Sequence, residues 1–267
     1  MNHCKIIFRS SLTSKEELLA ASRYFKCVSQ RTEIGNGDLV IGRYSIWPFY
    51  KEFENDVLAL GGHLINTYKE HLYVSDLGNW YEDLKEVTPK TWTSLEDVTD
   101  NDGPFVLKGE TNSYKSKWSS HAFAKNKKEA IQVMFNLFDD RFLMGQNLYI
   151  RKYIPLQRIC DGIGGIPISE EYRFFVLDGK ILCSGFYWSD VIEDIPDNIS
   201  SSKVPKEFLK KVIDLVGTHI RFYVIDVALT SVGEWIVIEL NDGQYSGLCG
   251  CDQQSLYENL CSMFLSL

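Results

Sequence analysis

The feature that most constrains this fold is a hairpin expected over residues 221–241, where apolar and polar side chains alternate along both strands. Asp226 lies among apolar neighbours on the first strand, while Glu239 and Asn241 share one face of the second. A tight turn over residues 232–233 would place Asp226 directly opposite Glu239. The pattern therefore predicts two carboxylates facing each other across a pair of half-buried strands.

Two carboxylates in this position destabilise a sheet unless a cation lies between them. Directly opposed Cβ atoms are roughly 4.5–5.5 Å apart, and like charges at that separation repel. Mg²⁺ prefers hard oxygen ligands and typically takes one or two carboxylates. We therefore predict that Asp226, Glu239 and Asn241 are magnesium ligands. Two alternatives stay open at this point: ordinary acids on a solvent-facing strand, or a register shifted by one residue.

The composition excludes several classes of protein. The chain has 267 residues, enough for one large domain or for two or three small ones, and a net charge of −8 that argues against general nucleic-acid binding. No apolar run approaches the roughly 20 residues of a membrane helix. The seven cysteines are scattered, with one close pair at Cys249 and Cys251, which is too few ligands for a zinc site and typical of reduced thiols. We expect a cytoplasmic protein without membrane contact.

Strands and helices are expected to alternate over the first 85 or so residues. Short apolar strands are predicted near residues 5–8 and 38–42, and an extended piece begins at His63. A capping box at Ser14 opens one helix, and a second helix runs from near Pro48 to Leu60. This order predicts a small parallel α/β unit.

The rest of the chain has the pattern of an α+β region. Strands are expected at residues 105–108 and 148–154, with a capped amphipathic helix from Asn126 between them. Asp178 and Gly179 form the turn of a first hairpin. Helices are also expected from Pro205 and at the C-terminus. The glycine-rich segment 159–167 lacks the spacing of a Rossmann or P-loop fingerprint and is expected to be a mobile loop.

One lysine and the loop after it have the chemistry of a phosphate site. Lys108 ends an apolar strand next to a glycine, and a lysine in that position can project over a ligand as a point charge. Residues 109–120, which include Ser113 and Lys115, are rich in hydroxyls and could close over a triphosphate. Snorkelling of Lys108 and a plain solvated loop are the simpler readings of the same residues.

The order of several short motifs resembles the ATP-grasp superfamily. The motifs are Pro89-Lys90-Thr91, Val106-Leu107-Lys108-Gly109, residues 149–154, residues 171–180, Asp226, and Ile238-Glu239-Leu240-Asn241. The chain is most similar to ligases that add glutamate to a ribosomal protein and to small ATP-grasp proteins of phage and bacterial gene clusters. The resemblance covers roughly residues 85–250. It implies a pre-ATP-grasp α/β domain over residues 1–87, a first ATP-grasp subdomain with a phosphate lid over 88–148, and a second subdomain with the metal site over 149–267.

The resemblance also implies roles for individual residues. Lys90 and Lys108 correspond to the lysines that hold ATP phosphates, and Ser113 and Lys115 lie in the loop that closes over them. Arg151, Lys152, Tyr153 and Ile154 correspond to the strand whose backbone recognises adenine. Arg173 corresponds to an arginine that contacts the transferred phosphoryl group, with Glu171 beside it on the same strand face. Asp226, Glu239 and Asn241 correspond to the magnesium ligands.

The activity implied by the resemblance is ligation of a carboxylate to an amine, with ATP and Mg²⁺ as cofactors. ATP converts the carboxylate into an acyl phosphate, and the amine then displaces phosphate, so that ADP and phosphate are released. The partners would be small-molecule or peptide substrates. One departure is that relatives carry an acid near Arg151 and Lys152, where this chain has two bases. Phosphotransfer without ligation, and nucleotide binding without turnover, are the alternative functions.

Overall fold

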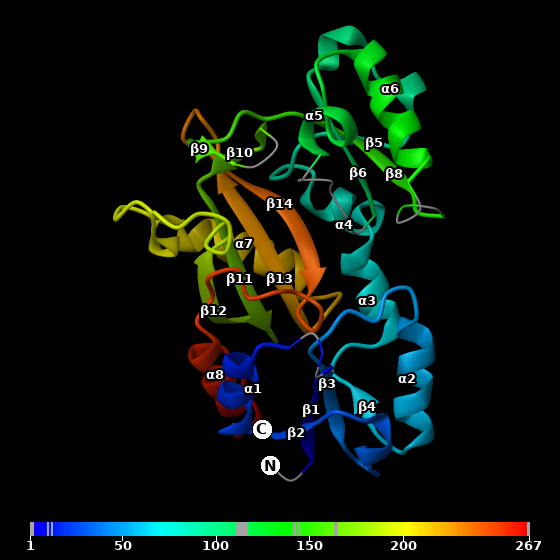
Figure 1. Ribbon diagram of the computed structural model, residues 1–267, viewed down its shortest axis with the longest axis vertical. Coiled ribbons are helices and arrows are strands. Elements are labelled where there is room, and N and C mark those ends of the chain that lie inside the picture. The colour runs from blue at the N-terminus through cyan, green and yellow to red at the C-terminus, as the bar shows by residue number, and fades with distance from the viewer. Residues whose placement is uncertain are drawn as a thin grey trace.

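The structure is a computed structural model that describes residues 3–9, 11, 13–110, 117–140, 143, 145–162 and 165–265. Three sheets succeed one another along its long axis, with the N-terminal sheet at one end (Figure 1). Short 3-10 helices lie at Arg31–Glu33, Leu95–Asp97, Asp100–Asp102 and Ser201–Lys203. Within the described ranges, no helix has the length and apolar character needed to cross a bilayer.

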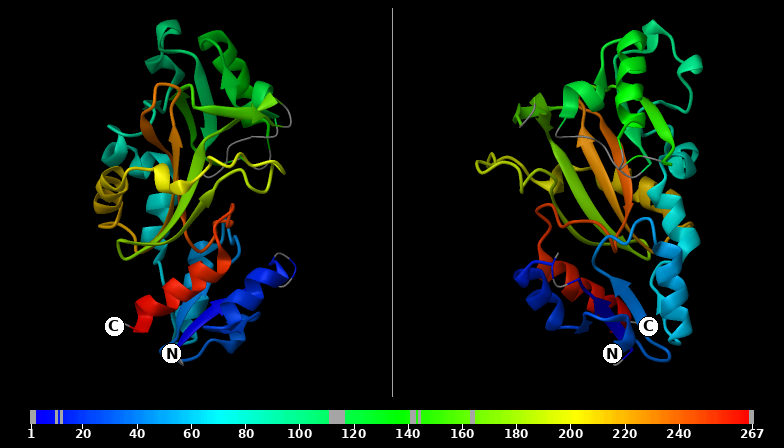
Figure 2. Two further views of the ribbon diagram at one scale, coloured as in Figure 1. Left: turned by 90° about the vertical axis from the view of Figure 1, so that its left-hand side faces the viewer. Right: turned by 45° about the vertical axis from the view of Figure 1, so that its right-hand side comes forward.

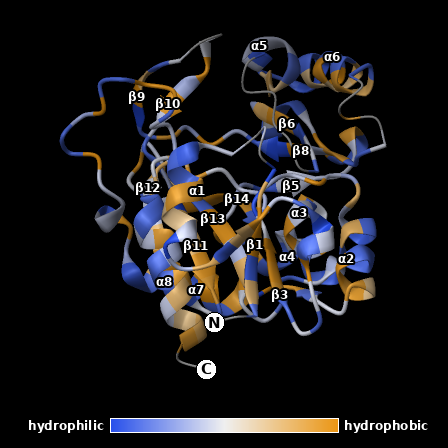
Figure 3. Cartoon of the chain, turned by 60° about the horizontal axis from the view of Figure 1, so that its bottom comes forward, coloured by the Kyte–Doolittle hydropathy of each residue, from blue (hydrophilic) through white to orange (hydrophobic). Residues whose placement is uncertain are grey.

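The N-terminal sheet is parallel, as the sequence predicts, with the strand order β2-β1-β3-β4. Its strands are β1 (Cys4–Ile7), β2 (Lys26–Val28), β3 (Leu39–Gly42) and β4 (His63–Leu64). Helices α1 (Lys15–Ser22) and α2 (Tyr50–Ala59) pack on opposite faces of this sheet, whose strands β1 and β3 are hydrophobic in Figure 3. Ser14 caps α1 by accepting a 3.0 Å hydrogen bond from the Glu17 amide, which confirms the predicted helix start.

The second sheet has the order β5-β8-β6-β7 and antiparallel pairing. Its strands are β5 (Thr91–Trp92), β6 (Phe105–Gly109), β7 (Phe123–Ala124) and β8 (Leu148–Lys152). The short helix α5 (Trp118–His121) precedes β7, and α6 (Lys127–Phe138) packs its apolar face on the sheet. Asn126 caps α6 by accepting a hydrogen bond from the Glu129 amide at 2.9 Å, as predicted.

The third sheet is antiparallel with the order β12-β11-β13-β14. It consists of β11 (Glu171–Leu177), β12 (Lys180–Phe186), β13 (Phe222–Leu229) and β14 (Trp235–Asp242). Helix α7 (Lys206–Val216) packs on one face, and the C-terminal helix α8 (Gln253–Leu265) packs against the other face and β12. Asp178 and Gly179 have φ values of 46° and 78°, so the first hairpin forms on the predicted tight turn.

Packing connects segments across the domain ranges expected from the sequence. Helices α3 (Tyr68–Ser75) and α4 (Leu77–Leu84), which the sequence analysis did not predict, place Val74, Trp80 and Leu84 in the core of the third sheet. Helix α8 returns to lie beside α1 of the N-terminal unit (Figure 2). The ranges 1–87, 88–148 and 149–267 stay a prediction.

The segment expected to be a mobile loop contains strands instead. Its described residues include β9 (Arg158–Asp161) and β10 (Pro167–Ser169), which pair antiparallel. Ile168 is fully buried and Ile166 is nearly so. The glycines obscured a short apolar alternation that pairs once the third sheet provides a surface for it.

Candidate functional site

A row of charged side chains crosses the third sheet. Arg173 on β11 is paired with Asp226 on β13, and Asp226 is paired with Glu239 on β14. The predicted opposition of Asp226 and Glu239 is therefore confirmed. The turn is wider than expected, because Leu229 pairs with Trp235, and a bulge at Ile238 restores the register. The bulge leaves both carboxylates on the face that the sequence predicts.

Arg173 is held by Asp226 and not by the strand neighbour that the sequence suggested. Its Nε and Nη2 atoms donate to Oδ1 and Oδ2 of Asp226 at 2.8 and 2.7 Å, while Nη1 donates to the Gly247 carbonyl at 2.8 Å. A bulge in the first hairpin also pairs Arg173 with Gly185 rather than Ser184. The two-point contact fixes the plane of the guanidinium group, and the Asp226 charge raises the pKa of Arg173 although burial opposes this shift.

Two cations reach β14 from the second sheet. Lys108 on β6 is buried, and its Nζ atom forms an ion pair with Oε1 of Glu239. Arg151 on β8 donates to the Ile238 carbonyl and to Oγ1 of Thr88, both at 2.7 Å. Burial lowers the pKa of Arg151 to about 10, against the opposing effect of Glu239, so the group stays charged at neutral pH.

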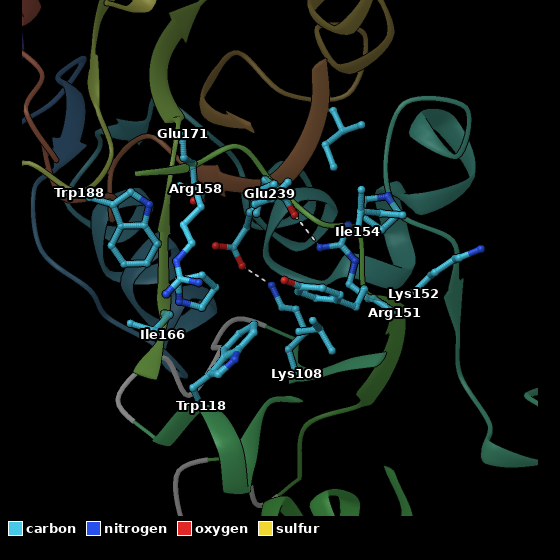
Figure 4. Close-up of a pocket in the computed structure, with 18 residues that line it drawn as sticks. Lys108, Trp118, Arg151, Lys152, Ile154, Arg158, Ile166, Glu171, Trp188 and Glu239 are labelled. Carbon is cyan, nitrogen blue, oxygen red and sulfur yellow. Dashed lines mark hydrogen bonds and ion pairs between the residues drawn. The ribbon is translucent and has the colours of Figure 1, made fainter. Parts of the chain in front are cut away.

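The pocket between the second and third sheets has a volume of about 210 Å³. In Figure 4, Lys108 and Glu239 point toward one another, with Trp118, Ile166 and Trp188 on one side and Arg151 on the other. Apolar walls suit a planar base, while the cations at one end suit phosphate oxygens. The buried Nε of Arg151 has no partner among the described residues, and a ligand oxygen would satisfy it.

Most residues assigned by the resemblance to nucleotide binding line this pocket. They are Lys108, Arg151, Lys152, Tyr153, Ile154 and Glu171, together with Glu239. The exposed amine of Lys152 points away from the pocket centre in Figure 4. Lys90 does not line the pocket: its Nζ atom lies 3.8 Å from Asp102 and 4.6 Å from the Trp92 ring centroid. Ser113 and Lys115 lie outside the described residues.

A second pocket of about 390 Å³ lies between the third sheet and the N-terminal unit. We call it the reaction pocket; Arg173 and Asn241 line it, and Glu239 lines both this pocket and the first. His71 faces Oδ2 of Asp242 across 3.1 Å at its border. A group transferred between ligands in the two pockets would pass beside Glu239.

The predicted magnesium ligands fit the ion unequally. Glu239 and Asn241 lie at the junction of the pockets, where they could hold Mg²⁺ together with phosphate oxygens. Both oxygens of Asp226 already accept from Arg173, so Asp226 has only its remaining lone pairs to offer. Within the described ranges there is no cluster of three or more His, Cys, Asp or Glu side chains. The donor set is therefore that of a phosphate-dependent site and not of a closed protein cage.

Several pocket residues were not identified from the sequence. Trp118 and Trp188 line the nucleotide-sized pocket, as do Arg158 and Ile166 from the β9–β10 hairpin. The alternation around Ile166 and Ile168 was a signal for that hairpin. The two tryptophans had no such signal, because they join the pocket from separate connections.

Comparison with known proteins places this geometry in a class. A family model described as an ATP-grasp domain, the third family of its clade, matches residues 95–260. The chain is thus an ATP-grasp protein. More narrowly, it belongs to that third family within the clade. No curated protein matches the chain.

Solved structures of ATP-grasp enzymes share the fold over almost the whole chain. A RimK domain ATP-grasp protein from Sphaerobacter thermophilus matches with a TM-score of 0.61 and 13% identity, over 98% of this chain and 99% of that one. D-alanine–D-alanine ligase from Bacillus anthracis, complexed with ATP, matches with a TM-score of 0.63 and 14% identity, over 99% and 98%. The ATP-grasp ligase PsnB, complexed with a minimal precursor, matches with a TM-score of 0.59 and 11% identity, over 100% and 99%. At these identities the likeness confirms the predicted fold, and the general class of ATP-dependent ligase follows from the family and its neighbours.

Proposed function

We propose that this protein uses ATP to activate a carboxylate as an acyl phosphate and joins it to an amine, releasing ADP and phosphate. The observation that carries the proposal is that two pockets meet at Glu239, one with apolar walls and cations and the other containing Arg173. An ATP-grasp ligase needs such a pair, because the nucleotide and the carboxylate must approach from different sides. We further propose that the protein works in the cytoplasm on small-molecule or peptide substrates.

The site residues would act mainly by binding and by electrostatics. A carboxylate that attacks the γ-phosphate brings two anions together, and nearby cations offset that charge. Lys108 and Arg151 lie on the nucleotide side, while Arg173 lies on the side of the reaction pocket. Bound Mg²⁺ would neutralise phosphate charge between these groups. No nucleophilic side chain is required, because the carboxylate is itself the nucleophile.

Arg173 is well suited to charge that develops during the reaction. Its side chain is buried, and Asp226 and the Gly247 carbonyl hold it at three points. A donor that is already oriented costs no reorganisation when the phosphoryl group becomes more negative. We propose that Arg173 contacts the transferred phosphoryl group or the acyl phosphate.

Hydroxylamine trapping tests the proposal directly. The protein is incubated with Mg²⁺, ATP and a panel of carboxylates, and hydroxamate and ADP are measured together. An acyl phosphate reacts with hydroxylamine, so a ligase yields hydroxamate and ADP in equal amounts. Glu239→Gln should abolish both products, whereas Glu234→Gln, at the exposed turn of the same hairpin, should leave them unchanged.

Other outcomes identify the alternative functions. A stable phosphorylated product without hydroxamate would mean phosphotransfer without ligation. Nucleotide binding with no ADP release for any carboxylate would mean a binding module. Either result overturns the proposed ligation.

A further inference from the structure

A third cavity, of about 630 Å³, lies at the carboxyl edge of the N-terminal parallel sheet. Phe8 and Arg9 follow β1, and Tyr44 follows β3, its neighbour in the sheet. From β1 the chain goes first to β2 on one side, and then to β3 on the other. Ligands in open α/β sheets bind at such a change of direction, in the crevice outside the carboxyl ends of the strands.

This cavity is continuous with the reaction pocket. Ser45 and Trp47 line both. Tyr245 also connects them, since it lines the reaction pocket and its hydroxyl is close enough to Tyr44 and Arg31 for these groups to influence its titration. Burial is the main cause that raises the Tyr245 pKa, and Tyr44 adds to it while Arg31 opposes it. We call the two connected cavities the substrate groove.

The outer end of the substrate groove has an apolar surface, and the described residues give it no dominant charge. The side chains of Trp47 and Phe49 are 40% and 59% exposed there. Arg31 forms an ion pair with Asp56, and the other two charged groups, Arg9 and Glu52, are of opposite sign. Exposed aromatic rings beside a cavity are suited to an apolar side chain of a ligand, because they offer large rigid contact area.

We propose that one substrate of the ligase is a peptide that occupies the whole substrate groove. Its reacting group lies beside Arg173 and Asn241, and its chain continues over the edge of the N-terminal sheet. An aliphatic or aromatic side chain of the peptide packs on Trp47 and Phe49. This inference rests on the proposed function, and it narrows the substrate class to peptides.

The size of the groove favours a peptide over a free amino acid. The reaction pocket alone, at about 390 Å³, falls within the roughly 300–1,000 Å³ that hold a whole small-molecule ligand. A single amino acid would therefore leave the outer cavity of about 630 Å³ and its aromatic rings without contact. An extended chain instead reaches about 3.3 Å further with each residue, and so spans both cavities.

Fluorine NMR of the full chain labelled with 5-fluorotryptophan separates this inference from the proposed function. Trp118 and Trp188 line the nucleotide pocket, whereas Trp47 lines the substrate groove. Trp47→Phe assigns the Trp47 resonance. Mg²⁺ with ADP should shift Trp118 and Trp188. The tetrapeptides Gly-Leu-Gly-Glu and Gly-Phe-Gly-Glu, at millimolar concentration, should shift Trp47.

Matched ligands and variants complete the experiment. Free leucine, free glutamate and the peptide Gly-Asn-Gly-Glu should shift Trp47 at least about tenfold less at equal concentration. Phe49→Ala should weaken binding of the leucine peptide about tenfold, as loss of an aromatic anchor does. Phe135→Ala, which removes a ring with 62% exposure on α6 in the second-sheet unit, should not change it.

The outcomes are distinguishable. If the nucleotide shifts its two tryptophans but no peptide shifts Trp47, the peptide inference is wrong and nucleotide binding stands. The inference is also wrong if free amino acids shift Trp47 as strongly as the peptides do. If Mg²⁺ with ADP shifts nothing, the proposed function itself fails.

Discussion

Arg173 and Asp226 form a buried two-point ion pair across β11 and β13, with N–O distances of 2.8 and 2.7 Å. The pair lies directly beside Glu239 in the same sheet. Asp226 is therefore engaged on both of its oxygens by a cation that belongs to the protein. This arrangement orients Arg173 into the reaction pocket and explains how two carboxylates can face each other without a large repulsion.

Replacement of Arg173 by lysine should separate a chemical role from a structural one. Lysine keeps the charge but cannot form the planar two-point contact, so turnover should fall on the order of 10²-fold. ADP affinity should change little, because Arg173 does not line the nucleotide pocket. Steady-state ADP release and a binding titration measure the two effects.

Arg221 supplies the matched control for that experiment. It forms a similar two-point pair with Asp178, at 2.9 and 2.7 Å, but at a partly exposed hairpin end. Arg221→Lys should keep normal turnover, because exposed ion pairs contribute about 0–1 kcal/mol. Normal turnover of Arg173→Lys would remove Arg173 from the reaction.

The two lysines that the resemblance assigns to phosphates should behave differently. Lys108 is buried in the pocket, so Lys108→Met should weaken ADP binding at least about tenfold, or about 1.4 kcal/mol. The side chain of Lys90 is 60% exposed beside Asp102, and Lys90→Met should change affinity less than about twofold. Isothermal titration with ADP and Mg²⁺ compares them. An equal loss for both variants would mean that Lys90 reaches the phosphates when nucleotide is bound.

Nucleotide should stabilise the protein only when magnesium is present. At a ligand concentration about 100 times the Kd, binding to the native state adds about 2.7 kcal/mol to the free energy of unfolding. Removing Mg²⁺, or replacing Glu239 with glutamine, should remove most of the rise in Tm. Glu234→Gln leaves the site intact and should keep the full rise. A Tm rise that survives chelation would show that the phosphates bind without the metal.

Asn66 should be essential for attaching the N-terminal unit to the third sheet. Its fully buried amide accepts from the Phe222 N–H at 3.0 Å and donates to the Phe222 carbonyl at 2.6 Å. Asn66→Ala leaves these buried backbone groups unpaired and should lower the free energy of unfolding by about 2 kcal/mol or more. Asn79→Ala, which removes an exposed bond to the Leu72 carbonyl, should cost less than about 1 kcal/mol. Urea denaturation measures both, and equal losses would contradict the attachment role.

Local patterns determined the elements and much of the third sheet. Strict alternation over residues 221–241 predicted two paired strands with Asp226 opposite Glu239, and the structure confirms it. The Asp178-Gly179 turn and the caps at Ser14 and Asn126 were equally legible. These signals succeed because they arise between residues that are close in the chain, where backbone geometry leaves few alternatives.

Only the tertiary structure decided which side chains meet. Lys108 and Glu239 are 131 positions apart and touch because two separate sheets pack edge to face around the pocket. Bulges, which the alternation does not announce, set Arg173 opposite Gly185 and gave Glu239 its register through an extra residue. Lys90 carries a matching motif, yet its strand end directs it to Asp102 and solvent. Sequence order thus determined which groups are present, while the packing of the sheets determined the distances between them, because long-range contacts depend on the summed shape of many buried side chains.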